Sequence, residues 1–316
     1  MKKFSAFLCL LLMALALGGC EKKPGEAGAT ATPAPALTIS AYPDADAADE
    51  SRVTLYFRYQ DTALLKQEMR SLEIMPNETR ELALVNALIA GSFEGGEALF
   101  PPQTQALSTQ VQDGVVFVTF NEALYSRYED ENSQTDPAEA KLRRELAMDA
   151  LVAALTESGE YHAVQVLVRA EAQVGTSMRL KNSYFLEENE LPCDVLTRCE
   201  EHLMTPANVA HSLLRAWQQR SFDTLYPLLS SQEDTKLLPA QALFSEAFAQ
   251  SPVLIAYTLT PGSIAIDGSS AVVCIDMTLR RADGSEYTLT GWPLRIKHEM
   301  GAWKVSLSTL QALMQL

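Results

Sequence analysis

The chain has 316 residues and carries 25 basic against 40 acidic side chains, a formal net charge of −15 at neutral pH. A surface of that sign repels phosphate, and the sequence shows no basic face of the kind that nucleic-acid binding needs. Nucleic acid is therefore excluded as a partner, whereas cations or basic proteins would be attracted.

The N-terminus has the layout of a secretory signal. Two lysines precede an apolar run over residues 4–17, and two glycines then lead directly into Cys20. The run is too short to cross a hydrocarbon core of about 30 Å, and small residues before a cysteine favour cleavage. We expect residues 1–19 to be a lipoprotein signal peptide that is removed before Cys20. The alternative is an ordinary signal peptide followed by an incidental cysteine.

This arrangement resembles that of bacterial lipoproteins. The resemblance implies that Cys20 carries diacylglycerol on its thiol and a further acyl chain, such as palmitate, on its amine, and more than one chain makes a stable anchor. Removal of the signal leaves 23 basic against 40 acidic residues, a net charge of −17. Since anionic headgroups repel such a body, attachment to the cell membrane would come from the lipid, at the extracytoplasmic face.

Lipidated Cys20 opens a segment, residues 20–50, that is rich in Ala, Pro, Thr, Gly and acid. This composition is typical of a flexible linker, which would span roughly 30 Å on average and about 100 Å when stretched. The rest of the chain exceeds one ordinary core. We therefore predict two domains, over residues 51–190 and 205–316.

The first domain is expected to mix strands and helices. A strand over 53–59 is followed by a helix that Asn77 caps and Gly91 ends, and Asp113-Gly114 is a strong hairpin signal. The second helix begins at Asp136-Pro137 with Glu139 placed to complete a capping box. The remaining predicted strands cover residues 107–111, 115–120 and 164–168.

The second domain is expected to place helices before strands. Thr205 and Pro206 form a cap and first-turn pair, and the helices should cover residues 206–217, 222–229 and 239–249. Antiparallel strands should follow over residues 255–259, 271–281, 287–297 and 303–307. This order predicts an α+β fold with the helices on one side of a sheet.

Residues 51–186 resemble the GerMN domain of sporulation and spore germination lipoproteins. The likeness is distributed over the opening strand, the helix end at 87–91, the step at 100–104, the segment 113–121 and the stretch 151–157 before 164–166. Two departures concern Asn121, which stands where a serine is usual, and 169–174, which lacks a glycine that many relatives carry. The resemblance implies a ring-building αβ module that associates with protein partners or with copies of itself and has no catalytic residues.

Residues 205–316 resemble the nuclear-transport-factor-like or SnoaL-like cone fold, mainly through 214–226 and Trp303-Lys304-Val305. Such cones can hold a small molecule, catalyse or dimerise. Asp276 shares a strand face with Cys274 and Thr278, so it would be an acid or base if it pointed into a cavity. We expect it to be exposed instead, because a buried acid needs a partner.

The sequence offers no catalytic signature. The four histidines never fall at metal-helix spacing, so no catalytic, cofactor-binding or metal-binding residue is assigned and no cofactor is expected. The stretch 130–136 superficially resembles a calcium loop, but it lacks the glycine and distal glutamate of an EF-hand, which favours a solvated acidic loop. Cys193 and Cys199 could pair as a disulfide outside the cytosol, and Cys274 is expected in the core.

The leading hypothesis from these patterns is a non-enzymatic, lipid-anchored extracytoplasmic protein. It would mediate protein–protein assembly through its GerMN-like domain in sporulation, spore germination or envelope function. The alternative is a small-molecule-binding or catalytic lipoprotein that acts through the C-terminal domain. A deep polar pocket within 205–316 would favour the alternative, and a flat, partly apolar face on 51–186 would favour assembly.

Overall fold

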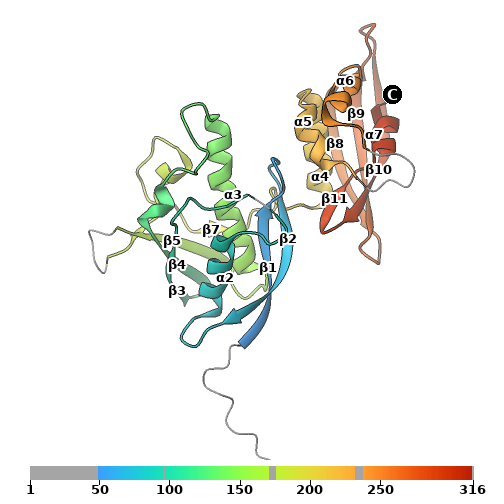
Figure 1. Ribbon diagram of the computed structural model, residues 1–316. Coiled ribbons are helices and arrows are strands. Elements are labelled where there is room, and N and C mark those ends of the chain that lie inside the picture. The colour runs from blue at the N-terminus through green and yellow to red at the C-terminus, as the bar shows by residue number, and fades with distance from the viewer. Residues whose placement is uncertain (1–48, 96, 171–175, 232–237, 315–316) are drawn as a thin grey trace, which may run out of the picture. The chain divides into compact units, whose positions relative to one another are not determined.

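The computed structural model describes residues 49–95, 97–170, 176–231 and 238–314. The expected signal peptide and Cys20 lie outside these residues, as does nearly all of the expected linker. Within them the chain has the predicted α+β fold (Figure 1). No helix of the described part is both long and apolar enough to span a membrane.

Buried apolar side chains form two separate clusters. The first draws on residues between 53 and 203. The second draws on Leu64 and on residues between 204 and 314. Each cluster is surrounded by its own helices and sheet, and the two parts of the chain are described in turn.

The first part contains a two-stranded ribbon, a larger sheet, two α-helices and two short 3₁₀ helices. In chain order these are β1 (Asp49–Arg58), β2 (Leu65–Ile74), α2 (Arg80–Ala90), β3 (Ala106–Gln112), β4 (Val115–Asn121), η1 (Glu122–Tyr125), α3 (Pro137–Thr156), β5 (Ala163–Arg169), β6 (Met178–Arg179), η2 (Asn182–Phe185) and β7 (Leu196–Thr197).

The ribbon pairs β1 with β2 in antiparallel register, and sequence analysis predicted only β1. Val53 lies opposite Arg70 and Leu55 opposite Glu68. Because these two charged residues of β2 are buried, at 9% and 6% exposure, the strand lacks the apolar alternation that would reveal it.

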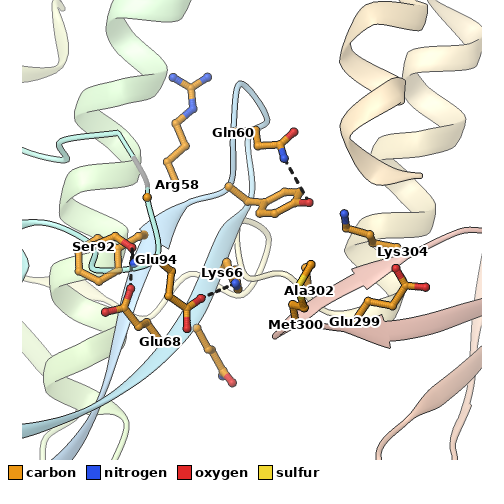
Figure 2. Close-up of a pocket in the computed structure, with 14 residues that line it drawn as sticks. Arg58, Gln60, Lys66, Glu68, Ser92, Glu94, Glu299, Met300, Ala302 and Lys304 are labelled. Atoms are coloured by element: carbon orange, nitrogen blue, oxygen red, sulfur yellow. Dashed lines mark hydrogen bonds and ion pairs between the residues drawn. The ribbon is translucent and has the colours of Figure 1, made fainter. Parts of the chain in front are cut away.

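Polar contacts join the ribbon to the segment after α2. The Ser92 hydroxyl donates to Glu68 at 2.6 Å, and Lys66 pairs with Glu94 at 2.6 Å (Figure 2). Arg70 forms an ion pair with Glu68 and donates to the Gly91 carbonyl at 3.0 Å. A buried arginine therefore satisfies both the carboxylate and the end of the helix.

The larger sheet has the strand order β3-β4-β5-β6, with β7 also paired to β5. β3 and β4 form the predicted hairpin, and the positive φ angles of Asp113 (52°) and Gly114 (74°) are those of a type I′ turn. β4 and β5 are parallel, and the chain between them crosses through α3.

The two helices lie between the ribbon and the larger sheet (Figure 1). Both contact β1, and α2 also contacts β3 while α3 contacts β5. The apolar side chains of α3 are buried almost throughout its second half, from Leu146 to Leu155. The helices therefore form the middle of the first hydrophobic cluster.

The helix caps correct two predictions. Thr79, and not Asn77, caps α2: its hydroxyl accepts from the Leu82 amide at 3.1 Å, while Asn77 has a positive φ of 72° in the preceding turn. Asp136 caps α3 as predicted. Glu139 does not complete a capping box, because it pairs with the buried guanidinium of Arg58 instead.

The second part places helices before an antiparallel sheet, as predicted. Its elements are α4 (Pro206–Gln218), α5 (Phe222–Leu225), η3 (Tyr226–Leu228), α6 (Gln241–Phe248), β8 (Val253–Ile264), β9 (Ser270–Arg280), β10 (Glu286–Glu299), β11 (Ala302–Lys304) and α7 (Leu307–Met314). The closing helix α7 was not predicted; it begins at Leu307, the last residue of the predicted strand 303–307, and its Leu310 and Leu313 are fully buried.

The second sheet has the order β11-β10-β9-β8. Along β9 the odd-numbered residues from Ala271 to Leu279 are buried and the alternate side chains are half-buried or exposed. Its buried face packs on α4, where Trp217 is fully buried and donates from Nε1 to the Pro252 carbonyl at 3.0 Å. The described helices of this part thus cover one face of the sheet, as predicted.

Candidate functional site

Parallel strands β4 and β5 end on the same edge of the larger sheet, and two hollows lie there. One, of about 300 Å³, is here called the carboxyl-end groove. It is lined by Glu122, Tyr125, Val168, Ala170, Met178, Arg179, Lys181, Ser183 and Glu190. The other, of about 750 Å³, is lined mainly by polar groups and shares Glu122 and Tyr125 with the groove. Tyr125 therefore borders both hollows.

Tyr125 is held firmly although it is 40% exposed. Its hydroxyl accepts from the Lys181 amide at 3.1 Å, and its ring meets the ring of Tyr184 edge-on, with centroids 6.3 Å apart. Tyr184 is buried in the core. Desolvation raises the pKa of the Tyr125 hydroxyl above its ordinary value. A rigid, half-open aromatic ring of this kind is suited to burial by a partner.

The groove combines an apolar floor with a charged rim. Met178 is 49% exposed, and Val168 lies beneath the surface at 6%. On the rim Lys181 pairs with Glu190 at 2.8 Å, an exposed pair worth little in stability. An apolar centre with polar surroundings is the usual composition of a protein–protein contact.

Asn121 shapes the second hollow. Its Oδ1 accepts from the Gln105 amide at 3.0 Å, and its Nδ2 donates to the Gln103 carbonyl at 2.9 Å. Both bonds fix the loop that enters β3, where Gln103 has a positive φ of 63°. The asparagine that departs from the GerMN pattern therefore has a structural role at the edge of this site.

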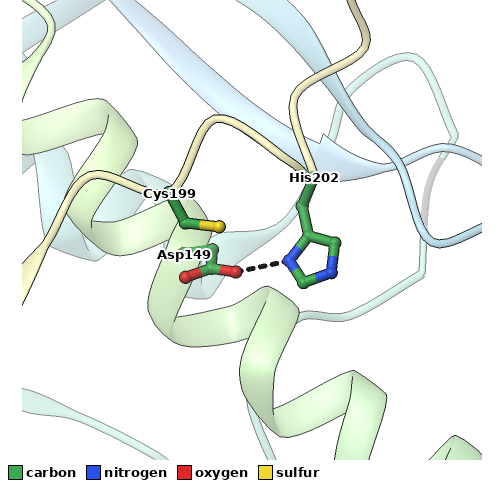
Figure 3. A group of neighbouring side chains, drawn as sticks. All are labelled: Asp149, Cys199 and His202. Carbon is green, nitrogen blue, oxygen red and sulfur yellow. Dashed lines mark hydrogen bonds and ion pairs between the residues drawn. The ribbon is translucent and has the colours of Figure 1, made fainter. Parts of the chain in front are cut away.

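The structure brings together three side chains that sequence analysis left apart. Asp149 of α3, Cys199 and His202 place one ligand atom each within 4.8 Å of one another (Figure 3). Nδ1 of His202 lies 2.5 Å from Oδ2 of Asp149. This hydrogen bond raises the pKa of His202 against the effect of burial, and the negative charges of Glu145 and Glu201 add to it. The Cys-x-x-His spacing of Cys199 and His202 was visible in the sequence, but Asp149 lies 50 residues before Cys199.

Cys193 and Cys199, which the sequence offered as a possible disulfide pair, are both free thiols in the structure. Cys193 is buried at 4% exposure, its amide donates to the Leu180 carbonyl at 2.7 Å, and burial raises the pKa of its thiol. Cys199 lies beyond β7 and faces α3. In the chain, β7 lies between the two cysteines and pairs with β5.

The acidic stretch 130–136 is occupied by protein contacts. Asp130 pairs with Arg143 at 2.6 Å, and Glu131 pairs with Arg144 at 2.9 Å. The hydrogen bond from Arg143 lowers the pKa of the Asp130 carboxyl. Two acidic side chains of this stretch are thus paired with arginines of α3.

Asp276 is exposed, as expected, and its carboxylate accepts from the Gly291 amide at 2.6 Å. Cys274, expected in the core, is only half-buried because it lies on the outer face of β9. The cone-like resemblance of residues 205–316 stays a prediction.

Comparison with known proteins finds a family match within the first part of the chain. Residues 54–172 match the sequence profile of the Germane family, described as "Sporulation and spore germination". The chain therefore carries a GerMN-type domain, as predicted. No curated protein matches the chain.

Two solved structures show partial likeness. The tandem GerMN domains of the sporulation protein GerM from Bacillus subtilis share 16% identity over 51% of this chain and 48% of that chain, with a TM-score of 0.31. A putative lipoprotein from Clostridium perfringens shares 20% identity over 38% of this chain and 74% of that chain, with a TM-score of 0.23. The chain thus spans about half the length of the tandem GerMN structure.

Proposed function

We propose that this chain is a non-enzymatic, lipid-anchored protein of the extracytoplasmic face, whose GerMN-type domain binds a protein partner during sporulation or spore germination. The match of residues 54–172 to a sporulation and germination family supports the process. The N-terminal pattern that ends at Cys20 supports the anchor. The carboxyl-end groove supports the binding of a protein.

The observation that carries the proposal is that the exposed side chains of Tyr125 and Met178 line the same groove. Both are about half exposed, and Tyr125 is held by its hydrogen bond to the Lys181 amide and by the ring of Tyr184. Rigid aromatic side chains lose little conformational entropy on binding, and buried anchors of this kind contribute about 2 kcal/mol or more each at protein interfaces. A partner would insert an apolar side chain beside Tyr125 and meet the charged rim around it.

The test is crosslinking and affinity purification of the full-length protein from its native cells, in growth and in sporulation. Met178→Glu places a charge in the groove and should reduce recovery of the partner at least about tenfold, because an unpaired charge is costly to bury. Met75→Glu is the matched control, since Met75 is 57% exposed on the turn after β2 and outside the groove. Equal loss in both variants, or loss in neither, would refute the role of the groove.

The anchor has its own test. Replacement of Cys20 by alanine should abolish incorporation of radiolabelled palmitate and release the protein from the membrane fraction, because Cys20 is the residue that would carry the lipid. Cys274→Ala is the matched control, a thiol of the second part that no lipid signal precedes. Labelled, membrane-bound protein after Cys20→Ala would contradict the proposed anchor.

A further inference from the structure

We propose that Asp149, Cys199 and His202 form a zinc site in the first part of the chain. The three residues offer a carboxylate oxygen, a sulfur and a ring nitrogen, all within 4.8 Å of one another (Figure 3). These three ligand types are those that zinc accepts in proteins. Metal ions softer than zinc bind carboxylates poorly, and harder metal ions bind thiolates poorly. A set that contains both ligands therefore points to zinc.

The geometry needs only small adjustments to hold the ion. Zinc bonds of about 2.0–2.3 Å in a tetrahedron place ligand atoms roughly 3.3–3.6 Å apart. Oδ2 of Asp149 and Nδ1 of His202 are 2.5 Å apart, so they would separate by roughly 1 Å as zinc replaces the hydrogen bond between them. Binding then releases the proton of that hydrogen bond and the proton of the Cys199 thiol.

The backbone that carries Cys199 and His202 is already fixed. The His202 carbonyl accepts from the Leu65 amide at 2.7 Å, and the Met204 amide donates back to the Leu65 carbonyl at 2.9 Å. On the other side of Cys199, the Arg198 guanidinium donates to the Ala153 carbonyl of α3 at 2.9 Å. Pre-organised ligands lose little entropy on binding, which favours a specific site.

The surroundings of the cluster also suit a cation. Asp149 and His202 have side chains that are 20% and 23% exposed, so the site is shielded but open to ions from solvent. Glu145 and Glu201 lie close enough to act electrostatically on His202, and Glu145 shares only a 3.8 Å pair with Lys141. Local negative charge concentrates divalent cations.

Three protein ligands leave one tetrahedral position for water. An ion at this place would bind the segment that leaves β7 to the middle of α3. It would therefore stabilise the end of the first part of the chain, where His202 and Met204 are hydrogen-bonded to Leu65 at the start of β2. This role does not depend on the proposed partner or on the lipid anchor.

The test uses the purified full-length protein after treatment with a chelator. Titration with zinc in a calorimeter should show one ion per chain, and cobalt should give the thiolate charge-transfer band and the visible bands of a tetrahedral site. Cys199→Ser and Asp149→Asn should each weaken zinc binding at least about tenfold, since even outer-shell changes cost that much. Asp149→Asn keeps a group that can hydrogen-bond to His202, so it guards against loss of folding. Cys274→Ser is the control and should bind zinc like the unmodified protein.

A second readout is hydrogen exchange, in which zinc should slow exchange in residues 198–204 of the unmodified protein and not of Cys199→Ser. Absence of zinc-dependent heat at millimolar metal overturns the proposal. So does zinc binding that keeps its affinity in both Cys199→Ser and Asp149→Asn, because the ion would then be held elsewhere.

Discussion

Replacement of Arg70 by methionine should strongly destabilise the first part of the chain. Arg70 and Glu68 are 9% and 6% exposed, and the guanidinium also donates to the Gly91 carbonyl and stacks over Phe93 at 3.6 Å. Methionine fills a similar volume but leaves the carboxylate buried without its cation. Removal of one partner of a buried pair costs about 3–5 kcal/mol. For a urea dependence of about 2 kcal/mol/M, the midpoint would fall by roughly 1.5–2.5 M.

The positions of the tryptophans make the assay selective. All three, Trp217, Trp292 and Trp303, lie in the second part of the chain, so their fluorescence reports on that part. Far-ultraviolet circular dichroism and peptide-resolved hydrogen exchange report on both parts. In Arg70→Met we expect the unfolding transition of residues 49–203 to move to lower urea while the fluorescence transition stays in place.

Two further outcomes separate charge from volume. The double variant Glu68→Leu/Arg70→Met should recover most of the lost stability, because it leaves no buried charge uncompensated. If Arg70→Met lowered the free energy of unfolding by less than about 1 kcal/mol, the reasoning would be refuted, since Glu68 would then be solvated or protonated at no cost.

Three other changes follow from the described contacts. Asp136→Ala removes the carboxylate that accepts from the Ala138 amide at the start of α3 and should lower the free energy of unfolding by about 1 kcal/mol in urea denaturation. Gly114→Ala should lower the free energy of unfolding by at least about 1 kcal/mol, because the φ of 74° is strained for alanine and the new Cβ would lie 2.8 Å from Nδ1 of His162. Adding His162→Ala to this variant should recover only the part of the loss that is due to the contact. Acid titration should show a loss of stability that Glu68→Gln abolishes. Burial alone raises the pKa of Glu68, but the hydrogen bonds from Ser92 and Arg70 outweigh burial and lower it. The stability that ionised Glu68 contributes is therefore present above the pKa of the unfolded state and is lost as the pH falls through the pKa of the folded state.

The sequence predicted most elements because their signals are local. The Asp113-Gly114 hairpin, the Asp136-Pro137 helix start and the Thr205 cap each depend on a few neighbouring residues, and all three are present. β2 was missed because its inward positions carry Glu68 and Arg70, whose burial depends on each other and on the end of α2. Their pairing depends on the tertiary structure, so the alternation of apolar and polar residues along the strand could not reveal it.

The candidate sites could be predicted less well, for the same reason. The carboxyl-end groove is lined by Tyr125 of η1 and Met178 of β6, and only the fold brings residues of these two elements to one groove. The Asp149–Cys199–His202 cluster joins the middle of α3 to a segment after β7. The Cys-x-x-His spacing was present in the sequence, yet it became informative only once α3 supplied the carboxylate.

The central claim is that the GerMN-type domain binds a protein through the carboxyl-end groove. The most direct measurement is to place a photo-crosslinking amino acid at Met178 or at Met75 in full-length protein and to illuminate native cells in growth and in sporulation. We predict that the probe at Met178 crosslinks to a discrete envelope protein or a second copy of this chain, with the contact mapped by mass spectrometry, and that the probe at Met75 does not. Crosslinks of equal yield and identity from both positions would contradict the account.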